Sequence, residues 1–362
     1  MKYPQTRKCI DRITPYVPGK PIEEVQRELG ISDVIKLASN ENPLGPSPLA
    51  VQAMVDAAAN MALYPDGAAL ALKEKLAAHL NVPVESLVVG NGSDEILKLI
   101  AEAFVDSEDS GIYADPSFSE YAYVLRLMGA REVAVPLVDF THDLEAMAQA
   151  MDETTKIVFV CNPNNPTGTI VDEASLRAFV DRIPEDVLVV IDEAYYEYVD
   201  DPSYPQTVPW VLERPNVVVT RTFSKVYALA GLRVGYAVAN PKLAADINRV
   251  KEPFNVNSMA QVAAIAALAD QAHVQKSVEV NRQGKEYLYA EFEKLGLAYV
   301  PTQTNFIYVD LGRPSADVYQ ALLRQGVIVR QGDPFGQPTF IRVTIGIPEQ
   351  NQRFVEALRT LF

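Results

Sequence analysis

A lysine just beyond a buried strand is the first residue whose position favours chemistry. The segment 217–236, VVVTRTFSKVYALAGLRVGY, begins with an apolar, β-branched run that predicts a strand. Thr222, Ser224 and Lys225 follow this run, and Arg233 lies further along. In open α/β sheets, ligands bind at the carboxyl ends of the strands. The segment therefore indicates an amine held beside an anionic group, although a lysine at such a place is more often a solvated surface charge.

Two earlier strand ends supply complementary groups. The strand in KIVFVCNPNNPTG leads to Asn162, Asn164 and Asn165, and the strand in VLVVIDEAYYEY leads to Asp192 and Tyr195. Each of these residues alone is better explained as a turn, cap or core residue. Their coincidence at successive strand ends is much harder to explain in that way, so we interpret them together as one site.

The combined set matches the chemistry of pyridoxal phosphate. A lysine amine forms a Schiff base with its aldehyde, and a carboxylate pairs with the pyridinium nitrogen so that the ring accepts electrons. Tyr195 and Asn165 offer hydrogen bonds to the phenolic oxygen. The hydroxyls, Arg233 and a helix start predicted after the glycine turn GNGSDE, residues 90–95, can bind the phosphate.

Near-continuous apolar strands alternate with helical segments up to about residue 240, which predicts a mostly parallel sheet covered by helices on both faces. Beyond it, helices precede several short strands, as in a smaller α+β domain. We therefore expect an α/β fold with three parts: an N-terminal arm, residues 1–35, that packs with the small domain, a large cofactor-binding domain, residues 36–250, and a small C-terminal domain, residues 251–362. Within the first two parts, Gly30 is expected to end a short helix, and Ser47 is expected to cap a helix that extends to about Asn60.

The composition favours a soluble cytoplasmic enzyme. The formal net charge of −15 over 362 residues argues against nucleic acid or an anionic membrane as a partner. The N-terminal segment lacks the apolar core of a signal peptide, and no apolar run is long enough to span a bilayer. Two distant cysteines and three scattered histidines predict neither a disulfide framework nor a metal site.

Five motifs carry a family resemblance: SNENPLGPSP, GNGSDE, CNPNNPTG, VIDEAY and TFSKVYALAGLRVGY. As a set they resemble the fold-type I aminotransferases, which depend on pyridoxal phosphate. Their order and wording are most similar to those of the histidinol-phosphate aminotransferases, and the match extends from Thr14 to Arg342. The resemblance implies transamination between histidinol phosphate and 2-oxoglutarate in histidine biosynthesis.

The resemblance also implies a role for each matching residue. Lys225 is the Schiff-base lysine, Asp192 binds the pyridine nitrogen, and both act in catalysis together with Tyr195. Tyr195 and Asn165 bind the phenolic oxygen. The phosphate is bound by six residues, namely Gly92, Ser93, Asp94, Thr222, Ser224 and Arg233. Phe118 stacks on the ring, where the family more often has tyrosine.

Other implied roles concern the partner subunit and the substrates. Tyr64 reaches the cofactor phosphate of a partner subunit, which implies a homodimer with shared active sites. Arg342 binds the carboxylate of glutamate or 2-oxoglutarate, while Tyr16, Asn42 and Arg330 line the substrate pocket. For Arg330, an ordinary charge at a strand end is almost equally plausible.

Three alternatives stay open on the sequence alone. An aromatic amino-acid aminotransferase would use the same chemistry on another substrate. A lyase that decarboxylates threonine phosphate would use the same scaffold and cofactor. A cofactor-sensing regulatory domain is disfavoured, because no basic DNA-binding module is appended to this acidic chain.

Overall fold

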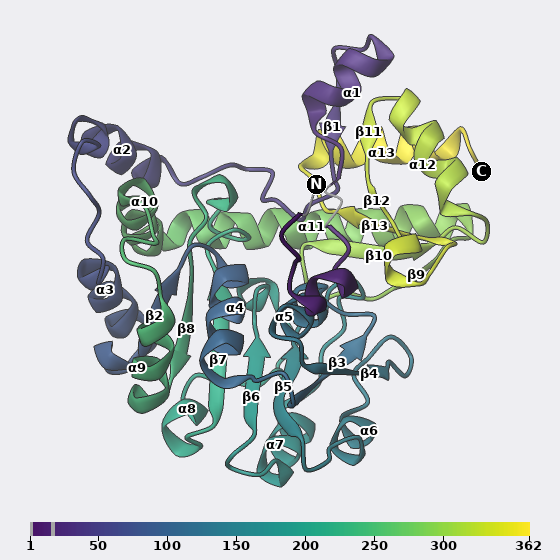
Figure 1. Ribbon diagram of the computed structural model, residues 1–362. Coiled ribbons are helices and arrows are strands. Elements are labelled where there is room, and N and C mark those ends of the chain that lie inside the picture. The colour runs from purple at the N-terminus through teal and green to yellow at the C-terminus, as the bar shows by residue number, and fades with distance from the viewer. Residues whose placement is uncertain (1–2, 16–18) are drawn as a thin grey trace.

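A seven-stranded sheet forms the centre of the larger body in the computed structural model, which describes residues 3–15 and 19–362 (Figure 1). Its strand order is β2-β8-β7-β6-β5-β3-β4, and β8 runs antiparallel to both its neighbours while the other strands run parallel to one another. The strands are β2 (Leu87–Gly90), β3 (Ser110–Asp115), β4 (Arg131–Pro136), β5 (Thr155–Cys161), β6 (Leu188–Asp192), β7 (Val217–Thr222) and β8 (Gly235–Ala239).

Helices cover both faces of this sheet, because alternate apolar residues of each strand point to opposite sides. Val189 and Ile191 of β6 pack on one face, and Leu188 and Val190 pack on the other. The first face, called face A here, is covered by α2 (Pro48–Ala57), α3 (Leu70–Leu80), α6 (Leu144–Gln149), α7 (Glu173–Arg182), α8 (Trp210–Glu213) and α10 (Ser258–Ala269). The second, face B, is covered by α4 (Ser93–Phe104), α5 (Glu120–Met128) and α9 (Pro241–Val250).

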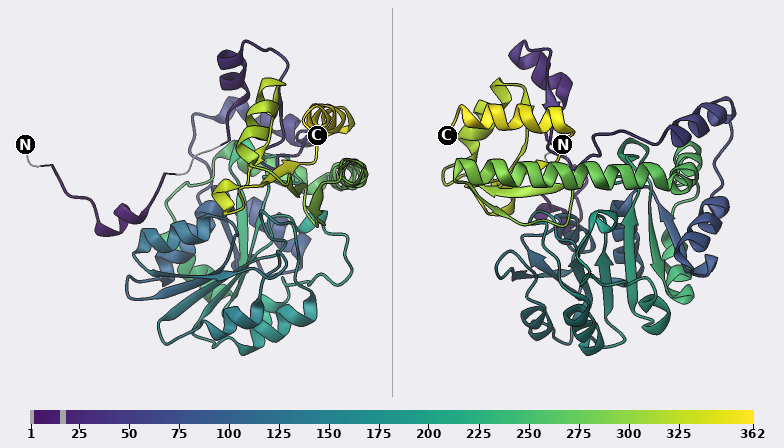
Figure 2. Two further views of the ribbon diagram at one scale, coloured as in Figure 1. Left: turned by 90° about the vertical axis from the view of Figure 1, so that its right-hand side faces the viewer. Right: turned by 180° about the vertical axis from the view of Figure 1, so that it is seen from behind.

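A smaller body contains a four-stranded antiparallel sheet in the order β12-β13-β10-β9. Its strands are β9 (Ala298–Val300), β10 (Phe306–Asp310), β12 (Arg330–Gln331) and β13 (Phe340–Thr344), and its helices are α12 (Ser315–Arg324) and α13 (Pro348–Arg359). The long helix α11 (Gln271–Leu295) joins the two bodies and crosses in front of both in the right-hand view of Figure 2. Val274 of α11 packs in the face A core, while Leu288 and Phe292 pack in the core of the small sheet.

The N-terminal arm contacts both bodies. Helix α1 (Ile22–Leu29) buries Val25 against Leu323 and Ile328 of the smaller body, and β1 (Ile35–Lys36) pairs in parallel with β11 (Val327–Ile328). The 3₁₀ helix η1 (Lys8–Arg12) instead lies beside α5 of the larger body. The other 3₁₀ helices are η2 (Ala58–Asn60), η3 (Val84–Ser86), η4 (Tyr196–Tyr198), η5 (Ala230–Leu232) and η6 (Asp333–Phe335).

Several expectations from the sequence are confirmed. The fold is α/β with a mostly parallel central sheet. The Ser47 side chain accepts a hydrogen bond from the Leu49 N–H and caps α2, and Gly30 ends α1 with φ of 67°. Within the described ranges, the structure has no helix of the length and apolar character needed to cross a membrane. The predicted division of the chain into three parts remains a prediction.

Candidate active site

The carboxyl ends of β5, β6 and β7 lie side by side and carry the first group of candidate residues. The register places Cys161, Asp192 and Thr220 next to one another across these strands. Asn165 follows β5, and Lys225 follows β7. Because parallel strands end at the same edge of a sheet, residues far apart in sequence gather here, as the sequence predicts.

Asp192 is buried on face B, and its two carboxylate oxygens differ. Oδ2 accepts a hydrogen bond of 2.8 Å from the Tyr121 hydroxyl, while the buried Oδ1 has no partner. Burial raises the pKa of Asp192 to about 6, and the Tyr121 hydrogen bond opposes that rise. A buried polar atom without a partner costs free energy, so Oδ1 marks a place for a hydrogen-bond donor that a ligand would bring.

Lys225 is the second reactive group at this edge. Its Nζ lies 3.5 Å from the Ser39 carbonyl oxygen and 5.6 Å from the centre of the Tyr195 ring. Burial, and then the positive charge of Arg342, lower its pKa to about 8. An amine with such a pKa exists in part as the neutral nucleophile near neutral pH.

Two predicted neighbours of these groups join the larger body to the smaller one. The Tyr195 hydroxyl accepts a hydrogen bond of 2.9 Å from Nδ2 of Asn40. Arg342 of β13 donates to Oδ1 of Asn165 and, at 2.9 Å, to the carbonyl oxygen of Ala38. The guanidinium predicted to bind a substrate carboxylate is therefore held at the same edge as Asn165, which is predicted to bind the cofactor.

The start of helix α4 forms the candidate phosphate site. Gly92 precedes the helix with φ of 93°, and a Cβ there would lie 2.6 Å from Nη2 of Arg233. Arg233 pairs with Asp94 at 2.8 Å. Ser93 lies in the first turn of the helix, beside the start of β8. The free backbone N–H groups of a helix start and a guanidinium together make an anion site.

Two hydroxyls at the end of β7 are the other residues predicted to bind the phosphate. Thr222, on face B, accepts a hydrogen bond of 3.1 Å from the Ser224 N–H.

Phe118 lies at the start of the α5 segment, where its ring makes an edge contact of 5.8 Å with Tyr121. Its half-buried ring is placed on the same face as Asp192.

The remaining predicted residues lie further apart. Tyr64 is 82% exposed and stacks on Phe254 at 4.8 Å. The side-chain amide of Asn42 donates to the Val226 carbonyl and to Ser277 of α11, so both its N–H groups have partners within the protein. Arg330 lies opposite Arg342 across β12 and β13. Tyr16 lies outside the described residues, and the substrate roles of Tyr16, Asn42 and Arg330 stay predictions.

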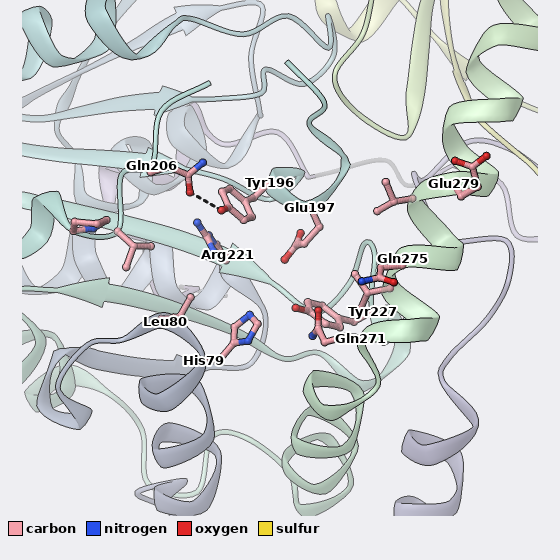
Figure 3. Close-up of a pocket in the computed structure, with 14 residues that line it drawn as sticks. His79, Leu80, Tyr196, Glu197, Gln206, Arg221, Tyr227, Gln271, Gln275 and Glu279 are labelled. Carbon is pink, nitrogen blue, oxygen red and sulfur yellow. Dashed lines mark hydrogen bonds between the residues drawn. The ribbon is translucent and has the colours of Figure 1, made fainter. Parts of the chain in front are cut away.

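On the opposite side of the same strand ends lies a buried ion pair. Nη2 and Nε of Arg221 lie 2.8 and 2.9 Å from Oε2 of Glu193, and the guanidinium covers the Tyr196 ring at 3.5 Å. Arg221 and Tyr196 border a cavity of about 650 Å³ between η4, α3 and α11 (Figure 3). Strand alternation places Arg221 on face A and its neighbours Thr220 and Thr222 on face B, so this cavity is separate from the Asp192 site.

Two neighbours of the site were missed in the sequence, Tyr121 and Asn40, and so was the ion pair of Glu193 with Arg221 on the opposite face. Glu193 and Arg221 stand directly beside predicted residues in VIDEAY and TRTFSK, so strand alternation could have pointed to the pair. Asn40 belongs to the same SNEN segment as Asn42. Nothing in the sequence around Tyr121 indicates a function, because an aromatic residue in a helix is usually a core residue.

Comparison with known proteins agrees with this geometry. Residues 32–358 match the family model for aminotransferase class I and II. A histidinol-phosphate aminotransferase from Moorella thermoacetica is 59% identical over 359 residues, which cover 99% of this chain and 93% of that protein. The crystal structure of histidinol-phosphate aminotransferase from Sinorhizobium meliloti, in complex with pyridoxal-5'-phosphate, has a TM-score of 0.91 at 28% identity and covers 100% of this chain and 99% of that one.

The same fold also serves another activity. The L-threonine-O-3-phosphate decarboxylase from Porphyromonas gingivalis has a TM-score of 0.80 at 24% identity and covers 91% of this chain and 99% of that one, a likeness of fold alone. The high sequence identity to a histidinol-phosphate aminotransferase over the whole chain places this chain with that group rather than with the decarboxylase. The chain belongs to the class I and II aminotransferase family, in the group of the histidinol-phosphate aminotransferases.

Proposed function

We propose that this enzyme transfers the amino group of histidinol phosphate to 2-oxoglutarate, giving imidazole-acetol phosphate and glutamate in histidine biosynthesis, with pyridoxal phosphate as cofactor. The observation that carries the proposal is the half-buried Lys225 amine, with its lowered pKa, at the same sheet edge as the unpartnered Oδ1 of Asp192. The identity of 59% to a histidinol-phosphate aminotransferase supports the choice of substrate.

The residues of this chain fit the cofactor. Oδ1 of Asp192 needs a donor, which a protonated pyridine nitrogen would provide. The helix start at Gly92 and the Arg233 guanidinium suit a phosphate. Pyridoxal phosphate, when bound, supplies an aldehyde that condenses with amines and a ring that accepts electrons from the bond cleaved at the substrate.

Lys225 moves the proton in this proposal. Its Nζ, with a pKa lowered to about 8, would accept the proton from the carbon that bears the substrate amine and donate it to the carbon of the cofactor's aldehyde group. Such positioned proton transfer accelerates reactions by about 10²–10⁴-fold. Asp192 stays ionised beside the ring nitrogen, and Tyr195 and Asn165 donate hydrogen bonds to the phenolic oxygen.

Arg342 binds the anionic end of each substrate. Glutamate and 2-oxoglutarate present a carboxylate, whereas histidinol phosphate has a phosphate and no α-carboxylate. A guanidinium offers donors that suit either anion. Because the Ala38 carbonyl and Asn165 hold Arg342 in place, little side-chain entropy is lost when a substrate binds. We propose that Tyr16, Asn42 and Arg330 contribute to the same pocket.

We propose that the active unit is a homodimer in which Tyr64 binds the cofactor phosphate of the partner subunit. Its support is the number of exposed apolar side chains on α2 and the segment after it, namely Leu49, Val55, Met61, Leu63 and Tyr64, together with Phe254, on which Tyr64 stacks. Exposed apolar residues in such number are typical of a protein interface. We further propose a cytoplasmic location, as the acidic composition predicts.

The proposed domain division keeps the arm, residues 1–35, and starts the cofactor domain at residue 36. Helix α10 packs against α2 and α3 in the face A core. We therefore infer that α10 moves with the cofactor domain, although residues 251–362 are predicted to form the small domain. The hinge would then lie within α11.

The direct test supplies the purified enzyme with pyridoxal phosphate and 2-oxoglutarate and offers three amino donors in separate reactions. Glutamate formed from histidinol phosphate, at a kcat/KM well above that for phenylalanine, supports the proposal. Preferred turnover of phenylalanine would instead indicate an aromatic amino-acid aminotransferase. Carbon dioxide released from threonine phosphate would indicate the decarboxylase.

A further inference from the structure

The contact between Tyr121 and Asp192 joins two elements that are far apart in sequence. The hydroxyl of Tyr121, on α5, donates to Oδ2 of Asp192, at the end of β6, over 2.8 Å. Both side chains are almost completely buried. Oδ1 of the same carboxylate is left without a partner. The hydrogen bond from Tyr121 therefore occupies Oδ2 and leaves Oδ1 available to a ligand.

Tyr121 is itself held rigidly. Its ring stacks on Phe159 of β5 at 4.8 Å with an interplanar angle of 15°, and Phe118 makes an edge contact with it at 5.8 Å and 85°. Burial raises the pKa of Tyr121 well above its ordinary value, so the hydroxyl keeps its proton and remains a donor. A fixed donor on a packed ring can orient a carboxylate with little loss of entropy.

The charge state of Asp192 depends on the groups that face it. These are Tyr121 from α5, Cys161 from β5, Asp94 from α4 and Tyr195 beyond β6. Burial favours the neutral acid and Asp94 adds a like charge, whereas the Tyr121 hydroxyl, and after it the Thr220 hydroxyl and the Ala194 backbone N–H, favour the carboxylate. Without that hydroxyl, a larger share of Asp192 would be protonated near neutral pH, and a neutral acid cannot pair with a protonated ring nitrogen.

We propose that Tyr121 is a positioning residue, which holds Asp192 ionised and turned so that Oδ1 faces the cofactor's ring nitrogen. This inference rests on the proposed function, because it assumes that pyridoxal phosphate occupies the site. It assigns to an otherwise ordinary core tyrosine a part in setting the affinity of the cofactor and the pH range over which the cofactor binds.

The test replaces the hydroxyl alone, with Tyr121→Phe, and measures the equilibrium affinity of the cofactor-free protein for pyridoxal phosphate as a function of pH. Tyr113→Phe is the matched control, since it removes a buried hydroxyl that donates to Glu132 on the same face of the sheet, away from Asp192. Thermal melting of both cofactor-free variants shows whether each one folds.

Tyr121→Phe is expected to weaken cofactor binding at neutral pH by about tenfold or more, as for loss of a hydrogen bond to a charged group. Its affinity should also begin to fall at a higher pH than that of the wild type, because Asp192 protonates more readily. Tyr113→Phe should match the wild type in both respects. A purely structural role would lower the affinity equally at every pH.

Three results would overturn the inference or its basis. An affinity and pH profile for Tyr121→Phe equal to those of the wild type would refute it, and so would a uniform loss without a shift in pH. If the wild type binds no pyridoxal phosphate, the proposed function fails, and the inference fails with it. Normal wild-type binding with an unchanged variant would sink the Tyr121 proposal alone.

Discussion

Replacing Arg221 with methionine should destabilise the protein strongly, although this residue faces away from the proposed cofactor site. Its partner Glu193 is completely buried, and Arg221 itself is 4% exposed. The substitution leaves Glu193 with a single side-chain donor, the Thr207 hydroxyl at 2.6 Å. It also removes the guanidinium from the Tyr196 ring. The main consequence is a carboxylate in the core without its counter-charge.

The cost of such a change is about 3–5 kcal/mol, the usual penalty for breaking a buried pair by removing one partner. In a larger domain, each 1 kcal/mol lowers the melting temperature by about 2–4 °C, so a decrease of roughly 6 °C or more is expected. The double variant Glu193→Gln/Arg221→Met carries no charge at either position, and its glutamine still accepts the Thr207 hydrogen bond. It should therefore melt above Arg221→Met.

The assay is thermal unfolding of the cofactor-free protein at one fixed concentration, because the melting temperature of the proposed homodimer would depend on concentration. Arg177→Met is the control. Arg177 also pairs with a glutamate, Glu213 at 2.7 Å, and lies over an aromatic ring, that of Trp210, but this pair is largely exposed. An exposed pair contributes about 0–1 kcal/mol. Equal melting of Arg221→Met and Arg177→Met, or a double variant less stable than Arg221→Met, would refute the reasoning.

Three further predictions concern the catalytic groups and pH. Lys225→Ala should abolish both glutamate formation and the visible absorption band of lysine-bound cofactor, and measurable turnover would contradict the assignment of the lysine. Asp192→Asn should bind pyridoxal phosphate more weakly than the wild type and lose at least about 100-fold in kcat, because the ring nitrogen loses its charged partner; a wild-type kcat would disprove that role. Burial lowers the pKa of His142 from 6.5 to about 4, so the unfolded chain binds a proton that the folded protein does not, and stability falls as the pH decreases through this window. Between pH 7 and about pH 4.5, unfolding measurements should show the wild type losing about 2–3 kcal/mol more than His142→Gln, and equal losses would exclude the histidine as a source of acid sensitivity.

The sheet and its reactive edge could be predicted because each depends on local sequence. Apolar runs such as those ending at Cys161, Ile191 and Val219 predict buried strands, and the polar residues that follow are expected to gather where parallel strands end. The position of Lys225 just after a predicted strand was therefore enough to predict that it lies at this edge of the sheet. The family resemblance then supplied the individual roles.

Other features depend on contacts between segments that are far apart in sequence. Hydrophobic periodicity does not predict such contacts. Tyr121 meets Asp192 across 71 residues, and Arg342 meets Asn165 across 177. Asn42 shows the converse case, since its position in the SNEN segment suggests a pocket residue while its amide joins Val226 to α11. The domain to which helix α10 belongs is also not evident from its sequence, because its alanine-rich face could pack in the core of the large domain as readily as in that of the small domain.

The central claim is that Lys225 is the residue that holds pyridoxal phosphate. The most direct measurement incubates the wild type with the cofactor, reduces the adduct with borohydride, and maps the modified peptide by mass spectrometry. We predict one modification per chain, on the peptide that contains Lys225. Modification of a different lysine, or no stable adduct at all, would contradict the account.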